Sequence, residues 1–171
     1  MSSPLLTIII PAFNEHMNLS ATVDEVLTAI RSHFKAYEII IIDDGSTDGS
    51  STLLTECSFI NLVQLDENSG KGIAIRKGLE KATHEKIVIS DGDMELDPRE
   101  IDKLMILDKD KGIHCAFGTR YKTIAPFTTL WDWGNFFFTG LFNMIHGSNH
   151  TDALCCAKAF FRDDIDRGNI S

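Results

Sequence analysis

The stretch Glu38–Gly49, which reads EIIIIDDGSTDG, decides the fold class of this 171-residue chain. Its run of isoleucines is typical of a strand that is buried on both faces, and the turn-forming residues behind it end that strand. We predict that the first strand of the chain is closed by Pro11. Further apolar runs of strand length lie at Leu6–Ile10, Ile60–Leu65, Ile87–Ile89 and His114–Phe117.

Segments between these runs carry apolar residues at helical spacing. Such residues recur three and four positions apart from Leu19 to Phe34, which predicts an amphipathic helix, and a second helix is predicted from Lys71 to Thr83. A third begins at Asp97, because an aspartate there can cap a helix. Buried strands that alternate with helices predict an α/β domain with a doubly wound, mostly parallel sheet that helices cover on both faces.

The charge balance restricts the ligands that the chain can bind. The net charge is −9, which disfavours a nucleic-acid-binding surface. An anionic ligand would need a cation to bridge it to the protein. The cysteines show no CxxC spacing, and there is no signal-peptide pattern and no apolar stretch of about 18 residues. These features predict a cytoplasmic protein with reduced thiols, either soluble or peripheral at the cytoplasmic face of the membrane.

Polar residues follow the predicted strands at the point where each strand ends. Asp and Asn are common in turns, so a single residue of this kind carries little weight. Here they follow three strands, and ligands of parallel α/β sheets bind at the carboxyl ends of strands. The residues are Asn14 and Glu15 after the first strand, Asp43 and Asp44 after the second, and Asp91 and Asp93 after the fourth.

The segment Asp91–Glu95, which reads DGDME, has the pattern of a metal site. In an extended chain, the side chains of Asp91, Asp93 and Glu95 project to the same side. Three converging carboxylates repel one another unless a cation lies among them. Oxygen ligands favour Mg²⁺ or Mn²⁺, which share their coordination shell with substrate phosphates. A structural Ca²⁺ site is the alternative, although the spacing is not that of an EF-hand.

These segments belong to a longer set of motifs that spans nearly the whole chain. The set comprises IIIPAFNE at 8–15, IIDDGSTDG at 41–49, NSGKG at 68–72, DGDME at 91–95 and GTRY at 118–121. In order and spacing it resembles the family-2 glycosyltransferases, and within them the dolichyl- and polyprenyl-phosphate mannosyl- and glucosyltransferases. Residues 151–162 resemble the segment that follows in those enzymes. The resemblance implies a GT-A fold, a UDP- or GDP-sugar donor, and Mg²⁺ or Mn²⁺ as cofactor.

The same resemblance implies roles for individual residues. The base and ribose of the donor would be held by Pro11, Phe13, Glu15, Ile42 and Asp44. The diphosphate and the metal would be held by Asp91, Gly92 and Asp93, and Glu95 would be a further metal ligand where those enzymes often have Gln. Arg120 would approach the donor phosphates or the transfer site.

The acceptor determines whether the reaction needs a general base. A polyprenyl or dolichyl phosphate is already anionic and can displace the diphosphate with inversion, while the metal stabilises that leaving group. A saccharide hydroxyl would need a carboxylate to take its proton. Asp152 is the candidate for this base, and a structural aspartate in a loop is the equal alternative. The predicted catalytic residues are therefore Asp93, Arg120 and Asp152.

An aromatic-rich helix is predicted over residues 131–145. Its side chains are either buried in the core or in a homo-oligomer interface, or they form a surface for the lipid acceptor and a peripheral membrane contact. We interpret His146 and His150 as loop histidines, because Gly147 breaks the helix. Lys71 is interpreted as a surface or donor-side lysine.

The chain departs from its relatives in two places. Cys156 and Ala157 stand where the family usually has a glycine and an aromatic residue, and the chain stops at Ser171, where relatives continue. We therefore expect one GT-A domain over 1–171 that lacks the C-terminal part usual in relatives. One alternative is a non-catalytic nucleotide-sugar-binding subunit that needs a partner chain. Another is a sugar-phosphate nucleotidyltransferase, which would have a Gly-rich loop where Pro11–Glu15 stands.

Overall fold

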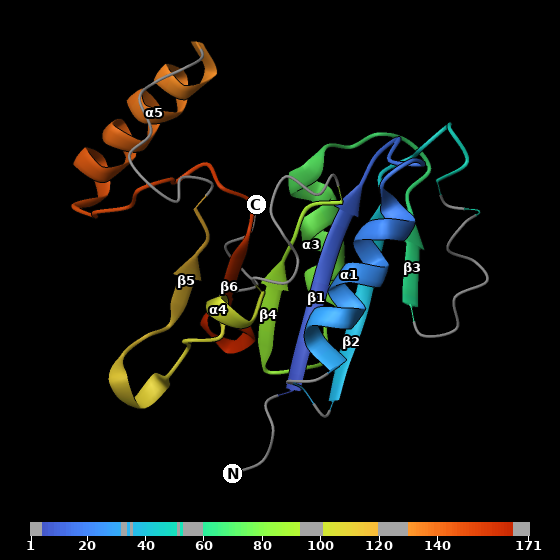
Figure 1. The fold of residues 1–171 in the computed structure, drawn as a ribbon, viewed down its shortest axis with the longest axis horizontal. Helices are drawn as coiled ribbons and strands as arrows, with labels where there is room; N and C mark the ends of the chain where they lie inside the picture. The colour runs from blue at the N-terminus through green and yellow to red at the C-terminus, as the bar shows by residue number, and fades with distance from the viewer. Residues whose placement is uncertain are drawn as a thin grey trace.

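The computed structural model describes residues 5–31, 34, 36–50, 52, 60–92, 101–119 and 130–165. Its centre is a six-stranded sheet in the order β3-β2-β1-β4-β6-β5 (Figure 1). The predicted strands are present, with bounds that differ by one or two residues from the expected ones. The strands are β1 (Leu5–Ala12), β2 (Ala36–Asp43), β3 (Ile60–Gln64), β4 (Lys86–Ile89), β5 (Cys115–Phe117) and β6 (Lys158–Phe161).

The first strand continues through Pro11, where the sequence analysis expected it to end. Parallel pairing of β1 with β4 covers only Leu6–Ile9, whereas pairing with β2 continues to Ala12. Pro11 has no N–H group, but it lies where β1 has a paired strand on one side only, so the sheet tolerates it. The strand therefore reaches further towards the carboxyl edge of the sheet than its apolar run indicates.

The last strand, β6, was not predicted. It is antiparallel to both β4 and β5 and separates these two strands in the sheet. Only Ala159 and Phe161 of its residues are buried, and so short an alternation cannot be told from a loop in the sequence. The sheet is mostly parallel, as predicted, but it does not continue the doubly wound pattern beyond β4.

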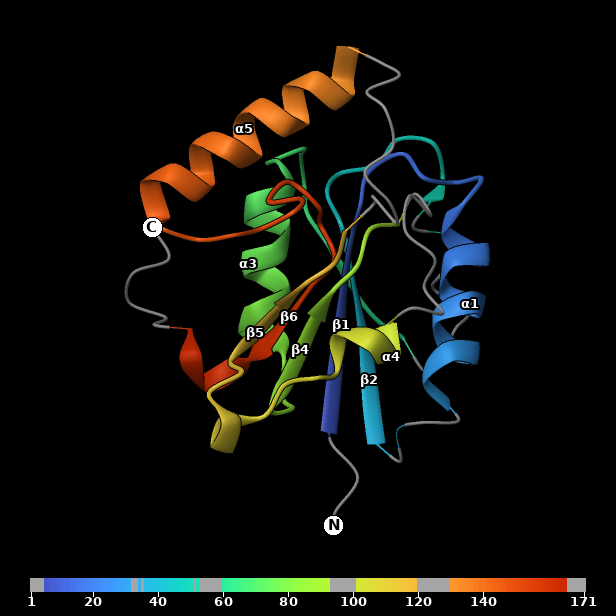
Figure 2. The same ribbon diagram turned by 60° about the vertical axis from the view of Figure 1, so that its left-hand side comes forward.

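Helices cover both faces of the sheet, as predicted (Figure 2). One face carries α1 and α4, the other carries α3, and α5 lies beyond the carboxyl ends of the parallel strands. Because residues 93–100 lie outside the described ranges, the expected helix start at Asp97 cannot be compared with α4. The helices are α1 (Leu19–Arg31), α3 (Lys71–Lys81), α4 (Ile101–Leu104) and α5 (Leu130–His146), with 3₁₀ turns at Lys109–Lys111 and Arg162–Asp164.

The two faces of the sheet form two apolar cores. Side chains alternate along β1, so that Ile8 and Ile10 pack with α1 while Ile9 packs with α3. Gly78 allows α3 to approach β1 closely, because a Cβ atom at that position would lie 2.5 Å from the Cγ2 atom of Ile9. Close packing on both sides keeps the parallel strands in register, and their carboxyl ends meet at one edge.

The aromatic helix α5 is not buried in the core of this chain. Its Thr139 is buried, but most of its large apolar side chains are open to solvent. The core interpretation is therefore wrong for the described side chains, and an oligomer interface or a lipid-facing surface remains. The exposed side chains are Trp133, Phe136, Phe137, Phe138, Leu141, Met144 and Ile145.

The end of α5 also differs from the expectation. His146 is the last residue of the helix and not a loop residue, whereas His150 lies in the following loop, as predicted. Gly147 ends the helix with a φ of 61°, in the left-handed region that glycine adopts readily. Of the helices described, none is long and apolar enough to cross a membrane.

Candidate functional site

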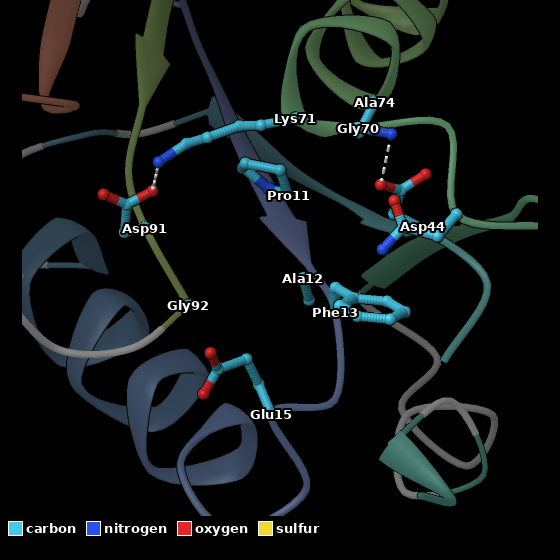
Figure 3. A pocket seen from close by; sticks show the side chains of 11 residues that line it. Pro11, Ala12, Phe13, Glu15, Asp44, Gly70, Lys71, Ala74, Asp91 and Gly92 are labelled. Carbon is cyan, nitrogen blue, oxygen red and sulfur yellow. Dashed lines mark hydrogen bonds and ion pairs between the residues drawn. The ribbon is translucent and has the colours of Figure 1, made fainter. Parts of the chain in front are cut away.

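A pocket of about 250 Å³ lies at the carboxyl ends of the parallel strands, at the edge where the sequence analysis placed the ligand (Figure 3). Its walls come from the ends of β1 and β4, the loops after β2 and β3, and the first turns of α3. The lining residues are Pro11, Ala12, Phe13, Glu15, Asp44, Asn68, Gly70, Lys71, Ala74, Asp91 and Gly92.

The loop after β1 is fixed to the loop after β2. Asn14 adopts a φ of 55°, and its backbone N–H donates to the hydroxyl of Ser46 at 2.9 Å. The side-chain oxygen of Asn14 accepts a hydrogen bond from the backbone N–H of Thr47, also at 2.9 Å. These bonds hold the segment that carries Phe13 and Glu15 at the mouth of the pocket.

Asp44 connects β2 to the start of α3. Its Oδ1 accepts a hydrogen bond from the backbone N–H of Ser69 and its Oδ2 from that of Gly70, both at 2.8 Å. Gly70 is the N-cap residue of α3 and has no side chain, so the Asp44 carboxylate takes the place of a cap at the positive end of the helix. Each carboxylate oxygen can accept a further hydrogen bond, which leaves Asp44 able to bind a ligand hydroxyl or N–H group.

The loops after β2 and β3 touch each other through their backbones. Gly45 has a φ of 74°, and a Cβ atom there would lie 2.6 Å from the carbonyl carbon of Glu67. A side chain at Gly45 would therefore push the second loop away from Asp44. This close approach is what brings Asn68 and Gly70 into the pocket wall.

Phe13 and Glu15 supply the surface that a planar, polar ligand needs. Phe13 is 42% exposed, and an aromatic ring left open at a pocket can stack on another planar ring. The Glu15 carboxylate is bonded by the side-chain amide of Asn18 at 3.3 Å, which orients it. Phe13 and Asp44 lie together at one end of the pocket, away from Asp91 (Figure 3).

The opposite end of the pocket is formed by an ion pair. The Lys71 ammonium lies 2.5 Å from Oδ1 of Asp91, whose side chain is only 12% exposed. Partial burial acts to lower the pKa of Lys71, but its contacts with Asp91 and Cys156 raise that pKa above the ordinary lysine value. Lys71 therefore remains an ammonium ion, and it faces the Asp91 side chain.

Cys156 contacts Asp91 from the loop that precedes β6. Burial of the thiol, its hydrogen bond to Asp91 and the negative charge of that carboxylate raise the pKa of Cys156 to about 11, against the opposing influence of Lys71. At neutral pH the thiol is protonated, so it acts as a hydrogen-bond donor to Asp91 and not as a nucleophile.

The backbone beyond Asp91 is anchored to α1. The Gly92 carbonyl accepts a buried hydrogen bond from the Thr22 hydroxyl at 2.9 Å. Asp93, Glu95 and Arg120, which the sequence analysis assigned to the metal, the diphosphate and the transfer site, lie outside the described residues. Within the residues that are described, no group of three His, Cys, Asp or Glu side chains could hold a metal ion.

Two of the predicted site residues lie away from this pocket. Ile42 is fully buried and packs in the α3 core, so its side chain cannot touch a ligand and any role would fall to its backbone. Asp152 is 1% exposed and lines a second pocket of about 320 Å³, beside β5 and α4. The structure does not bring Asp152 into the pocket of Asp44 and Asp91.

The loop that carries Asp152 is attached to α5. The side-chain oxygen of Asn143 accepts hydrogen bonds from the backbone of His150 and the hydroxyl of Ser148, both at 2.9 Å. The Thr139 hydroxyl accepts one from the backbone N–H of Ala153 at 3.2 Å. The position of Asp152 therefore depends on the position of α5.

Four pocket residues, Ala12, Asn68, Gly70 and Ala74, were given no role from the sequence. Asn68 and Gly70 belong to the NSGKG motif, which was a usable signal, whereas Ala74 looks like any small residue on a helix. Lys71 had two interpretations, and the structure places it in the pocket wall. The contact of Cys156 with Asp91 could not be predicted, because it depends on β6 lying beside β4.

A model of the family described as Glycosyl transferase family 2 matches residues 7–168, nearly the entire chain. The chain belongs to this family. The resemblance stated from the motifs is thereby confirmed, and with it the α/β GT-A fold. The nucleotidyltransferase alternative is not supported, because the match is to a transferase family of another kind.

The two curated relatives of this chain described below carry the same name. The undecaprenyl-phosphate 4-deoxy-4-formamido-L-arabinose transferase of Yersinia pestis (strain Pestoides F) is 36% identical over 105 residues, which are 58% of this chain and 32% of the relative. The enzyme of the same name from Pectobacterium carotovorum subsp. carotovorum (strain PC1) is 35% identical over the same shares. The match thus spans about a third of the length of these relatives.

Solved structures share the fold. Glucosyl-3-phosphoglycerate synthase from Mycobacterium tuberculosis, in complex with phosphoglyceric acid, aligns with a TM-score of 0.69 over 94% of this chain and 57% of that chain. The sequence identity is 18%, so this likeness concerns the fold and not the substrate.

Proposed function

We propose that this chain binds a UDP- or GDP-sugar in the pocket and transfers the sugar, with inversion and with Mg²⁺ or Mn²⁺, to a polyprenyl or dolichyl phosphate. The observation that carries the proposal is that the two ends of the pocket present different chemical groups. Phe13 and Asp44 lie at one end and the Asp91 carboxylate at the other, at the carboxyl ends of strands in a family-2 fold. The acceptor class is supported by the curated relatives, which are undecaprenyl-phosphate sugar transferases.

At the nucleoside end, three groups supply recognition. The exposed ring of Phe13 stacks on the base, and the carboxylates of Asp44 and Glu15 accept hydrogen bonds from base N–H groups or ribose hydroxyls. Asp44 is rigid because its oxygens already hold the start of α3. The same helix directs its N-terminal N–H groups and Lys71 towards the diphosphate.

At the diphosphate end, Asp91 suits a divalent cation. It offers oxygen ligands at the pocket, and the positively charged ammonium of Lys71 already lies beside it, where a divalent metal ion would bind. We propose Asp93 and Glu95 as the remaining protein ligands. When bound, Mg²⁺ or Mn²⁺ supplies Lewis-acid stabilisation of the diphosphate leaving group. The synthase from Mycobacterium tuberculosis that shares the fold has been solved with Mn²⁺ and uridine diphosphate.

The transfer step forms a bond from an acceptor phosphate oxygen to the anomeric carbon while the bond from that carbon to the diphosphate breaks. The attack comes from the face opposite the diphosphate, which inverts the anomeric configuration. No proton has to be removed, because the acceptor is anionic, and Arg120 is proposed to approach the phosphates. The burial of Asp152 in a separate pocket favours this phosphate acceptor over a sugar hydroxyl that would need a base.

The exposed aromatic face of α5 is proposed as the peripheral contact with the cytoplasmic face of the membrane that holds the acceptor. Its Trp133 and Phe136–Phe138 side chains are open to solvent. Aromatic side chains of this kind are stable at the boundary between water and lipid. A homo-oligomer that covers the same face is the competing occupant.

The proposal is tested first on the donor. Calorimetry with UDP and GDP, each with and without Mn²⁺, should show metal-dependent binding of at least one of them. Asp93→Ala should lose the metal-dependent part, whereas Asp102→Ala, which removes the same charge from the exposed side of α4, should keep it. Unchanged metal-dependent affinity in Asp93→Ala would remove the metal assignment.

The acceptor is tested with the nucleotide-sugar that binds. Addition of a polyprenyl phosphate in detergent should release the free nucleoside diphosphate and form a glycosylated lipid. Donor binding without release, under conditions that keep the protein folded, would favour a non-catalytic nucleotide-sugar-binding subunit.

A further inference from the structure

The ion pair between Lys71 and Asp91 occupies an oxygen that the donor site needs. Lys71 is the first residue of α3, and its side chain extends across the pocket, past Pro11, to reach Asp91 (Figure 3). The Lys71 side chain is 51% exposed and Asp91 only 12%, so the carboxylate is the fixed partner and the lysine the movable one.

Lys71 lies in the first turn of α3, where the helix dipole disfavours its positive charge and favours a bound anion. A cation in the first turn of a helix is repelled by the helix dipole, whereas a phosphate is attracted there. The Asp44 carboxylate takes the N–H groups of Ser69 and Gly70, so a phosphate at this helix start would bind the N–H groups of the residues that follow, Lys71 and Gly72. A diphosphate in the pocket would therefore attract both the helix start and the Lys71 ammonium.

We propose that Lys71 is an internal counter-ion that holds Asp91 in the absence of ligand and moves to the diphosphate when the donor binds. Its departure leaves the Asp91 oxygen to the divalent cation, because an ammonium and a divalent ion cannot share one oxygen without strong repulsion. The inference rests on the proposed donor site. Metal and nucleotide then bind cooperatively, and by linkage each raises the affinity of the other by the same factor.

Cys156 has a supporting part in this exchange. The thiol contacts both Asp91 and Lys71, but it is carried by the loop before β6 and not by α3, so we expect its hydrogen bond to Asp91 to remain after the lysine has left. Asp91 is thus oriented in both states, and only the cation beside it changes.

The experiment measures Mn²⁺ affinity by calorimetry in 0.15 M salt, without nucleotide and with whichever of UDP or GDP the wild type binds. Without nucleotide, Lys71→Met should bind Mn²⁺ roughly 2- to 5-fold more tightly than the wild type, as expected for loss of one partly exposed pair. The factor by which nucleotide increases Mn²⁺ affinity should fall correspondingly. Lys71→Arg, which retains the charge, should remain close to the wild type.

A matched control separates this effect from net charge. Lys77 lies in the same helix and pairs with Glu80 on the surface, so Lys77→Met removes the same charge without touching Asp91. Its Mn²⁺ affinity should change by less than about 1.5-fold, because the charge is screened over this distance. Addition of Asp91→Asn to Lys71→Met should abolish the gain.

Three results would overturn the inference: an unchanged or weaker Mn²⁺ affinity in Lys71→Met, an equal gain in Lys77→Met, or a gain that survives Asp91→Asn. The Mn²⁺ measurement without nucleotide does not depend on the proposed nucleotide-sugar donor. If the wild type binds neither UDP nor GDP, the donor site itself is refuted, whatever Lys71→Met does with Mn²⁺ alone.

Discussion

Replacement of Asp44 tests whether one carboxylate both holds the pocket and binds the ligand. Asp44→Ala removes the acceptor of two backbone N–H groups, those of Ser69 and Gly70. Loss of a charged acceptor from a partly buried N–H costs about 1–3 kcal/mol, and the two bonds share one side chain. We expect a loss of about 2–3 kcal/mol in the free energy of unfolding.

The assay combines thermal unfolding with donor binding. For a chain of this size, about 2–3 kcal/mol corresponds to a fall in Tm of roughly 4–9 °C. UDP and GDP affinity should also fall when measured well below the Tm. Asp44→Asn should be intermediate in stability, because the amide offers one acceptor oxygen and turns an N–H donor towards the other backbone N–H.

Asp66→Ala is the matched control, because Asp66 is exposed in the loop after β3 and carries the same charge. It should change the Tm by less than about 2 °C, since surface substitutions away from such contacts have small effects. A Tm for Asp44→Ala equal to that of Asp66→Ala would refute the assignment of Asp44 as the substitute cap of α3. Lower stability with unchanged affinity would make Asp44 a structural residue only.

Three further predictions concern other parts of the molecule. Partial burial acts to raise the pKa of Glu38, but hydrogen bonds from Thr7, Thr83 and His84 lower it from 4.5 to about 2. The carboxylate therefore stabilises the fold above pH 4.5, and this contribution is lost as the pH falls from 4.5 towards 2. Above pH 4.5, the free energy of unfolding of Glu38→Gln should be lower than that of the wild type by about 1 kcal/mol, after allowance for solvent screening. This difference should shrink as the protein is titrated with acid. A gap that stays constant from pH 6 to pH 3 would contradict this. Iodoacetamide at pH 8 should label Cys156 at least tenfold more slowly than the exposed Cys115, because a pKa of about 11 leaves roughly one thiolate in a thousand; equal rates by mass spectrometry would exclude the protonated thiol. Phe137→Ser with Phe138→Ser should reduce sedimentation with anionic liposomes and leave nucleotide affinity intact, whereas a change in oligomeric state without any liposome binding by the wild type would assign the face to a second copy.

The sequence predicted the parallel part of the sheet, β1 to β4, in which the strands are covered on both faces. Such strands read as uninterrupted apolar runs, and the polar residues that end them mark the ligand edge. For this reason the strand ends predicted that Glu15, Asp44 and Asp91 lie at one edge of the sheet, whereas Phe13 was assigned to the site only by the resemblance to the family. The position of Asp44 was predicted, but its two bonds to the start of α3 were not, because nothing local in the sequence indicates which backbone it meets.

The rest depended on contacts between distant segments. β6 is short and half-buried, so its insertion beside β4 left no readable pattern, and the approach of Cys156 to Asp91 follows from that insertion. Side chains two positions apart on a strand face the same side, so Ile42 lies with Ile40 in the α3 core. Assigning family roles one residue at a time takes no account of this alternation. Exposure of α5 was undecidable from its composition, since apolar helices can face a core, a partner or a lipid.

The insertion of β6 also orders the events of synthesis. β1 to β4 can pair once the first ninety or so residues have emerged, roughly half of the chain, but β4 then presents an open backbone edge at Ile87–Ile89 until Lys158–Phe161 arrives. β5 is made earlier than β6 yet has no described neighbour in the sheet other than β6, so it cannot take its place in the sheet until β6 has been made. An apolar strand with a free edge is a template for pairing with other chains. The interval between these two moments is therefore the period in which a nascent molecule is most exposed to aggregation.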